Sequence, residues 1–381
     1  MTCKRKLLFI FSFISAILMQ TACSDIKETQ DINYATAIGV DYKEGKYHCY
    51  IQLVDLTKVA KTEGSNPEPA KMWVSEATGD IFIDAFFEIY QTAQERFIWG
   101  HVTAIVLSEA AIEKGFQEIY DGLTRYHEFR LTPWVYGTSE PIKDILSTPG
   151  FFGQTSLNTV LHNPVSTFSQ SSQLKPIQFF QFARQVYEPA YTSYLPSLAI
   201  NRTQWEQNEE KEPKLFMNGA YFIKNDDYKG FYPLAELMGL RWLIPDMKRV
   251  PLLIPIEKKA TLLTVFTDPK ATFKVTDSKI EVMINAKGIV ANRDNHGVTN
   301  LNKMEKLAEK SIKEEVQGVF QLGIKENTDF LNLEHTLFRE KGMDWRKNQS
   351  LSELTLNLEV NVEFIHSGAL ENKIIDIKKL R

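Results

Sequence analysis

The first 23 residues limit most strongly what the rest of the chain can form. Three basic residues, Lys4 to Lys6, precede an apolar run from Leu7 to Met19 that only serines interrupt. As a helix this run covers about 20 Å, which is short of the roughly 30 Å hydrocarbon core of a bilayer. The arrangement is typical of an export signal rather than of a permanent membrane span. No later segment approaches about 18 uninterrupted apolar residues, so we expect the body to fold in water outside the cell membrane.

The end of the apolar run predicts a lipid anchor. Small residues, Thr21-Ala22, stand directly before Cys23, although the usual Leu at the third position before the cysteine is replaced by Gln20. In a lipoprotein the thiol forms a thioether to diacylglycerol, whose two acyl chains suffice for stable anchoring. We therefore predict a lipoprotein signal peptide over residues 1–22 and lipid attachment at Cys23. Ordinary cleavage, leaving Cys23 free or in a disulfide, is the alternative.

Composition narrows the class of protein further. The 381 residues are 43% hydrophobic and 12% aromatic, which is typical of globular chains with real cores and argues against disorder. A chain of this length usually divides into two or three domains. The net charge of -4 gives the whole surface no electrostatic reason to bind nucleic acid. Once the signal is removed and Cys23 is lipidated, only Cys49 remains, so neither a disulfide framework nor a CxxC metal site is possible.

Hydrophobic periodicity predicts an N-terminal α/β region over residues 23–205, with two subdomains as one option. Residues 24–33 are expected to be a tether and residues 57–70 a loop, because both are polar. Between and after them strands and helices alternate, which is typical of a compact α/β unit. The expected elements are a hairpin of Ala35–Asp41 and Tyr47–Leu53, strand Met72–Ser75, helix Ile81–Gln94, strand Val102–Leu107, a helix capped by Ser108 and running to Tyr126, strand Leu131–Gly137, helix Pro141–Leu146, irregular residues 150–173 and helix Pro176–Val186.

A polar stretch, residues 201–214, is predicted to be a linker and the domain boundary. A C-terminal α+β domain is expected over residues 214–381. Its expected elements are strand Phe216–Ile223, helix Leu234–Leu243, strands Leu252–Val265, Ala271–Val275 and Ile280–Val290, a long amphipathic helix Leu301–Phe320 and strand Leu354–Phe364. The fold class is therefore predicted as multi-domain α+β, with a mixed strand–helix N-terminal part and a C-terminal antiparallel sheet with a long helix.

A search for chemistry finds no catalytic signature. The sequence lacks GxSxG, GxxxxGK[ST], GxGxxG and HExxH, and no two of its seven histidines stand three or four residues apart. Asp226-Asp227 with Gly230 is expected to form a turn rather than a calcium loop, because alternating oxygen ligands and a closing Glu are missing. The aromatic runs are expected in the core. They are Trp134-Val135-Tyr136, Phe179-Phe180-Gln181-Phe182 and Arg241-Trp242-Leu243. We predict no catalytic residue, metal ligand or cofactor.

Several segments together resemble the Ger(x)C family, the C subunits of nutrient germinant receptors in spore-forming bacteria. The match runs over nearly the whole chain in the family's order and spacing. One departure is Ser24, which stands where the family usually has Trp after its lipid-bearing cysteine. The segments that carry the resemblance are Cys23–Glu28 followed by Tyr34–Asp41, His101–Glu109, Arg125–Thr132, Asn218–Ile223, Asp329–Leu331 with Trp345, and Val360–Val362 ahead of Gly368.

The resemblance implies a three-domain α+β lipoprotein on the outer face of the cell membrane or inner spore membrane. It implies integral membrane A and B subunits as partners, in an assembly that senses nutrients. The family offers only the lipid-bearing Cys23 to carry over and no catalytic residue. A three-domain arrangement would follow if the hairpin at 34–54 paired with the strand at 216–223.

Three functions are therefore weighed. The leading hypothesis is a non-catalytic, lipid-anchored receptor subunit needed for spore germination, which docks onto membrane partners. The second is a membrane-tethered solute-binding lipoprotein that captures a nutrient directly, which requires a cleft with converging polar groups. The third is a surface enzyme, against which the missing catalytic motifs argue. Whether the chain touches a nutrient stays open at this point.

Overall fold

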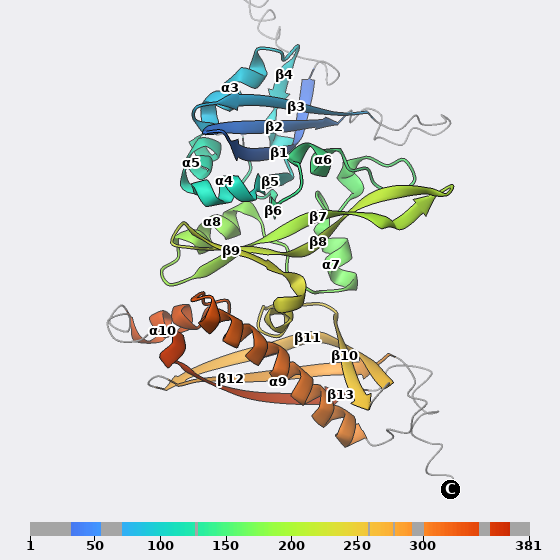
Figure 1. Ribbon diagram of the computed structural model, residues 1–381, viewed down its shortest axis with the longest axis vertical. Helices are drawn as coiled ribbons and strands as arrows, with labels where there is room; N and C mark the ends of the chain where they lie inside the picture. Colours follow the sequence, from blue (N-terminus) through green and yellow to red (C-terminus); the bar gives the residue numbers. More distant parts are fainter. Residues whose placement is uncertain are drawn as a thin grey trace, which may run out of the picture.

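A computed structural model of the chain describes residues 32–54, 71–125, 129–257, 260–276, 279–291, 301–342 and 351–365. These residues form a nine-stranded and a four-stranded sheet, stacked along the long axis of the molecule (Figure 1). We call residues 32–233 the nine-stranded unit and residues 234–365 the four-stranded unit. The predicted signal peptide, Cys23 and the predicted loop at 57–70 lie outside the described residues, as does all but the end of the predicted tether.

The nine-stranded sheet has the order β3-β2-β1-β5-β6-β7-β8-β9, and β4 pairs with β1. Its centre is parallel and its two ends are antiparallel hairpins. The predicted first hairpin is confirmed, with Glu44 and Gly45 at positive φ in its turn. The strands are β1 Ile32–Lys43, β2 Lys46–Val54, β3 Met72–Gly79, β4 Arg96–Ile98, β5 Ala104–Ser108, β6 Trp134–Thr138, β7 Thr192–Gln207, β8 Glu210–Lys224 and β9 Asp227–Pro233.

The expected pairing of the first hairpin with residues 216–223 is wrong. β1 pairs with β5 instead, and β5, β6 and β7 separate it from β8. The physical reason is that β5 and β6 are short buried strands, which need a neighbour on each side to satisfy their backbone polar groups. Inserting them into the sheet moves β1 away from β8.

Helices cover both faces of the nine-stranded sheet. One buried cluster includes Phe82, Ile119 and Phe182 from three different helices. The other, on the opposite face, includes Ile142 and Leu146. The helices are α3 Phe82–Tyr90, η3 Trp99–His101, α4 Glu109–Lys114, α5 Gln117–Arg125, α6 Ile142–Ser147, η4 Ser156–Asn158, α7 Pro164–Gln170 and α8 Phe179–Tyr187.

The helix expected from Ser108 to Tyr126 is two helices, α4 and α5. Ser108 caps the first as predicted, its hydroxyl accepting a hydrogen bond from the Ala111 N–H at 3.1 Å. Gly115 then takes φ 116°, a backbone angle that L side chains rarely adopt, and the helix ends there. The segment 150–173, expected to be irregular, contains η4 and α7.

The polar stretch at 201–214 is a β-hairpin and not a linker. It forms the ends of β7 and β8, whose pairing runs from Asn201–Lys214 to Gln207–Glu210. Asn208 and Glu209 close the turn with φ of 51° and 69°. A hairpin of this kind satisfies its backbone groups by pairing with itself, so it needs no apolar pattern on either face. Where the chain divides into domains stays a prediction.

The four-stranded sheet has the order β10-β11-β12-β13, and helix α9 covers one face of it (Figure 1). Residues 252–265, expected as one strand, belong to two strands, and the helix expected at 234–243 is a pair of 3₁₀ turns. The elements are η5 Leu234–Glu236, η6 Met238–Trp242, β10 Val250–Glu257, β11 Ala260–Thr276, β12 Lys279–Val290, α9 Leu301–Lys325, α10 Leu333–Lys341, η8 Leu351–Glu353 and β13 Thr355–Phe364.

The last strand departs from the expected antiparallel pattern. β10, β11 and β12 are antiparallel, but β13 runs parallel to β12 because α9 and α10 carry the chain back to the starting end of β12. β13 is also an edge strand. The backbone N–H groups of Val362 and Phe364 donate to the carboxylates of Glu309 and Glu305 on α9, at 3.4 and 3.1 Å.

The two units share one buried core. Phe222 of β8 and Tyr232 of β9 pack edge-on against Phe330, which follows α9. Asn332 adds a polar link, because its side chain accepts from the Thr192 N–H at 2.7 Å and donates to the Thr192 carbonyl at 3.2 Å. The start of β7 is therefore held against the four-stranded unit.

Candidate interaction surface

The outer part of the β7–β8 hairpin extends beyond the body of the molecule (Figure 1). Residues of β7 are buried from Thr192 to Ile200 and exposed from Arg202 to Gln207. Burial gives way to exposure at Asn201, whose side-chain oxygen accepts hydrogen bonds from the N–H groups of Thr203 and Gln204 on the same strand. The hairpin is therefore built from a buried base and an exposed end.

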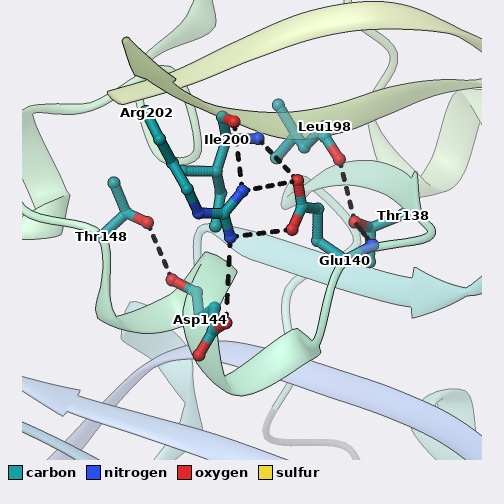
Figure 2. Close-up of polar contacts among 7 residues, drawn as sticks. All are labelled: Thr138, Glu140, Asp144, Thr148, Leu198, Ile200 and Arg202. Atoms are coloured by element: carbon teal, nitrogen blue, oxygen red, sulfur yellow. Dashed lines mark hydrogen bonds and ion pairs between the residues drawn. The ribbon is translucent and has the colours of Figure 1, made fainter. Parts of the chain in front are cut away.

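An ion pair clamps the hairpin at this change (Figure 2). The Arg202 guanidinium donates to both Glu140 oxygens at 3.1 and 2.9 Å and lies 4.0 Å from the Asp144 carboxylate. Glu140 also accepts from the Ile200 N–H at 3.3 Å. Since these donors stabilise the carboxylate, they hold the pKa of Glu140 below its ordinary value. Glu140 and Asp144 lie just before and within α6, so the exposed hairpin is fixed to the sheet's helical layer.

A second contact supports the clamp. The Thr138 hydroxyl donates to the Leu198 carbonyl at 2.9 Å and accepts from the Glu140 N–H at 3.0 Å. At the C-terminal end of α6, the Thr148 hydroxyl donates to the Asp144 carbonyl (Figure 2). Strand β6, helix α6 and strand β7 are thus connected through side chains as well as through the sheet.

Aromatic side chains gather beside the exposed hairpin. The ring of Trp205 meets the ring of Phe151 edge-on at 4.9 Å. The next residue, Phe152, is 94% exposed and has φ 56°. Phe216 of β8 is also exposed. We call Phe151, Phe152, Trp205 and Phe216 the hairpin surface. Groups of exposed large apolar side chains on a folded protein mark sites of interaction.

A cavity of about 340 Å³ opens beside the hairpin surface, between the segment 150–174 and strand β8. Its walls are mainly apolar and include Val160, Phe168, Leu174, Leu215, Met217 and Leu234. Lys214 lines it as well, with its ammonium 5.1 Å from the centre of the Phe151 ring. The cavity has the size and apolar character of small-molecule sites.

The residues singled out in the sequence lie elsewhere. Cys23 is outside the described residues, so its lipid attachment stays a prediction. Cys49 is a buried free thiol, as expected, and burial raises its pKa. Asp226 lies in the β8–β9 turn, where it accepts from the Phe116 N–H at 2.9 Å. Among the described residues, no three His, Cys, Asp or Glu side chains are grouped so that they could hold a metal ion.

The aromatic runs mostly serve packing, and one histidine is buried with them. Val135, Tyr136, Phe179 and Phe182 are buried, and Trp242 donates to Glu315 in the core of the four-stranded unit. His162 is a buried hydrogen-bonding histidine, bonded to Thr103 at 2.6 Å and to Gln52 at 3.0 Å. Because burial disfavours the charged ring, it lowers the pKa of His162 to about 3.

Sequence reasoning missed the hairpin surface. Two signals were present, the adjacent Phe151-Phe152 in a Gly-rich stretch and a single Trp205 within a polar run. A large aromatic residue with polar neighbours on both sides suits an exposed strand that contacts a partner.

Comparison with known proteins gives matches along the chain. The model of the spore germination protein N-terminal domain matches residues 25–200, and the model of the "Spore germination B3/ GerAC like" C-terminal domain matches residues 217–368. Spore germination protein KC of Bacillus subtilis (strain 168) is 20% identical, over 97% of this chain and 98% of that protein. The putative spore germination protein YfkR of the same organism is 18% identical over 77% of each chain.

A solved structure, of the GerBC protein, covers 86% of this chain and 97% of its own, at 16% identity and a TM-score of 0.49. Among the described residues, no helix has the length and apolar character needed to cross a membrane. Fold and family models together define a multi-domain α+β spore germination protein. The chain belongs to the Ger(x)C family, which confirms the resemblance seen in the sequence.

Proposed function

We propose that this chain is a lipid-anchored, non-catalytic subunit of a nutrient germinant receptor, and that it docks onto integral membrane A and B subunits. The observation that supports this most is that both family models match in order along the chain, and they follow the signal peptide predicted over residues 1–22 and the predicted lipid attachment at Cys23. We infer the A and B partner subunits and the location on the outer membrane face from the resemblance to the Ger(x)C family.

The anchor would act by raising local concentration. The chain from Cys23 to Ile32, where β1 begins, can span at most about 30 Å when fully extended. A body confined so closely to a membrane meets membrane-embedded partners as if the contact were intramolecular, at an effective concentration of about millimolar. Weak docking contacts then suffice.

The hairpin surface, a group of exposed aromatic side chains among the described residues, suits docking. Its aromatic side chains offer large contact areas at low conformational cost. The clamp by Arg202 holds the hairpin in place before a partner arrives, which reduces the entropy lost on binding. We assign the partner contact to this surface.

Replacing the lipidated cysteine tests the anchor. We expect Cys23→Ala to release or mislocalise the protein and to blunt germination, whereas Cys49→Ala, a change at a buried thiol, retains both. Membrane fractionation and a nutrient-triggered germination assay measure the two outcomes. Intact mass spectrometry of protein from native membranes should show a mature chain beginning at Cys23 with diacylglycerol. Normal retention and response in Cys23→Ala would rule the anchor out.

Docking is tested separately. We expect Phe152→Ala with Trp205→Ala to reduce co-purification of the A and B subunits while membrane retention is unchanged. Leu253→Ala, at an apolar side chain on the four-stranded unit whose exposure lies between those of Phe152 and Trp205, is the control and should co-purify normally. Equal loss in the control, or no loss in the hairpin variant, rejects this surface as the contact.

A second candidate function is direct capture of a small solute. The cavity beside the hairpin favours it, because a mainly apolar cavity with a few polar groups is the usual form of a ligand site. The cavity and the lipid anchor involve different residues, whereas Phe151 and Phe216 belong both to the hairpin surface and to the cavity lining.

A further inference from the structure

We propose that the cavity beside the β7–β8 hairpin binds a small molecule with an apolar body and one anionic group, and that Lys214 holds the anionic group. This rests on the second candidate function and names its ligand class. It depends on neither the lipid anchor nor docking to partner subunits.

The apolar walls of the cavity determine which part of a ligand can fill it. With a volume of about 340 Å³, the cavity lies at the small end of the range for ligand sites, about 300–1,000 Å³. Phe168 of α7, Leu174 of the following loop and Met217 of β8 line it with apolar side chains. A compact aromatic or branched aliphatic group would displace water from between these apolar side chains.

Lys214 determines the charge of the ligand. Its side chain is only 12% exposed, although an ammonium is among the groups most costly to bury. The ammonium has three N–H donors. The contacts found for it are the Glu212 carboxylate at 3.3 Å and the face of the Phe151 ring. An acceptor on a bound ligand would use the remaining donor capacity, and an anionic acceptor forms the stronger, charge-assisted bond.

The hairpin fixes where this ammonium lies. Lys214 pairs across the strands with Asn201, one residue before the Arg202 clamp. Phe151, whose ring lies 5.1 Å from the ammonium, is also in edge-on contact with Trp205. Both the cation and its aromatic neighbour are therefore set in position without a ligand, as a preorganised site requires.

Glu212 opposes an anionic ligand and offers a control. Its carboxylate lies next to the proposed position of the ligand's anionic group, so the two like charges repel each other. Glu212→Gln removes the repulsion and retains a hydrogen-bond acceptor for Lys214. The proposal therefore predicts tighter binding in this variant, an effect that damage to the hairpin could not produce.

Three probes that differ only in their terminal group test the proposal: 3-phenylpropionate, 3-phenylpropan-1-ol and 3-phenylpropylammonium. Each is titrated calorimetrically into the full chain in lipid nanodiscs, and heat from empty nanodiscs is subtracted. We expect the propionate to bind about tenfold more tightly than the alcohol, which corresponds to about 1.4 kcal/mol, and the ammonium compound to bind most weakly. Lys214→Met should remove the preference, Lys214→Arg should retain it, and Glu212→Gln should strengthen it.

Any of three results overturns the proposal. The first is the absence of binding by all three probes at millimolar concentration. The second is equal binding of acid and alcohol in the unmodified chain, and the third is an acid preference that persists in Lys214→Met. Circular dichroism of each variant checks that it is folded. Because the assay reads neither localisation nor germination, its failure leaves the receptor-subunit proposal in place.

Discussion

The nine-stranded and four-stranded units solve the problem of burying a sheet in different ways. In the nine-stranded unit helices and loops cover both faces, and the central strand β5 is buried at every residue. In the four-stranded unit α9 covers one face, and β12 alternates buried and exposed residues from Lys279 to Gly288. Parallel strands need cover on both faces, whereas a mainly antiparallel sheet can leave one face to water.

The difference extends to how each unit uses an arginine–glutamate pair. In the four-stranded unit Arg241 is buried and donates to both oxygens of Glu315, at 3.2 and 2.6 Å. In the nine-stranded unit Arg202 is half exposed where it clamps Glu140. The first pair holds η6 against α9 inside the core, and the second only positions an exposed hairpin. The comparison teaches that the same two residue types serve folding in one unit and site geometry in the other.

Breaking the buried pair should have the largest effect. We expect Glu315→Ala to destabilise the protein by about 3–5 kcal/mol, because it leaves the buried Arg241 charge without its partner. Urea denaturation measures the loss. The control is Glu314→Ala, at an exposed position whose ion pair with Lys310 is within one helix face, and it should change stability little. Similar losses in both variants would contradict the comparison.

Truncating side chains on opposite faces of one strand tests the burial difference. In β7, Leu195 and Leu198 are fully buried on opposite faces of the sheet, so each change to Ala should cost about 2–5 kcal/mol. In β12, Ile284→Ala should cost as much, whereas Met283→Ala, at a 40% exposed side chain, should cost at most about 0.5 kcal/mol. Chemical denaturation of the four variants compares them. A large loss of stability in Met283→Ala would show that the face of the four-stranded sheet opposite α9 is covered.

Acidification should affect the two units in opposite directions. The pKa of His162 falls from 6.5 to about 3 on burial, so its stabilising contribution is present above pH 6.5 and is lost as the pH falls toward 3. The pKa of Asp329 rises from 3.8 to about 6 on burial, so its contribution is present below pH 3.8 and is lost as the pH rises through 6.

From pH 7 to pH 5 the nine-stranded unit should therefore lose about 2 kcal/mol and the four-stranded unit gain about 1 kcal/mol. Hydrogen exchange of amides in β5 and β12, corrected for intrinsic rates, measures each unit. Asp329→Asn keeps an acceptor for the Glu334 N–H, which donates to Asp329 at 2.7 Å, and should abolish the gain. The same response in both units would contradict the assignment.

Removing the clamp should have the smallest effect on folding. We expect Arg202→Ala to leave the denaturation midpoint unchanged, because the pair is largely in water. The amides from Trp205 to Glu212 should exchange faster, since the hairpin loses its contact with α6. A marked drop in the midpoint would mean that the clamp serves folding as the buried pair does.

Patterns among near neighbours in the sequence predicted most helices and strands correctly. The predicted pairing between strands that are far apart in the sequence was wrong. Ser108 as an N-cap and the alternation at Ile280, Val282 and Ile284 depend on near neighbours, and both predictions are confirmed. The partner of β1 depends on which buried strands compete for it, which no local pattern encodes. The sequence predicts a linker at residues 201–214, the outer end of the β7–β8 hairpin, because this exposed, self-paired part shows no core-facing pattern.

The candidate site was beyond sequence reasoning for a related reason. The cavity forms only where residues near 150–174 meet β8, and the distance along the chain hides that meeting. Phe151 and Lys214 are 63 positions apart in the sequence, yet the ammonium of one lies over the ring of the other. Such a pair becomes recognisable only after the fold has brought the two segments together.

The contact between α9 and β13, the edge strand of the four-stranded sheet, affects how copies of the chain meet when they lie close together on one surface. A bare strand edge offers its N–H groups to any neighbour and can grow into an intermolecular sheet. At one end of β13, Glu305 and Glu309 already occupy those donors. They also present negative charge to an approaching identical edge, which repels it. Copies of the chain at high density can therefore lie side by side without forming an intermolecular sheet through this end of β13.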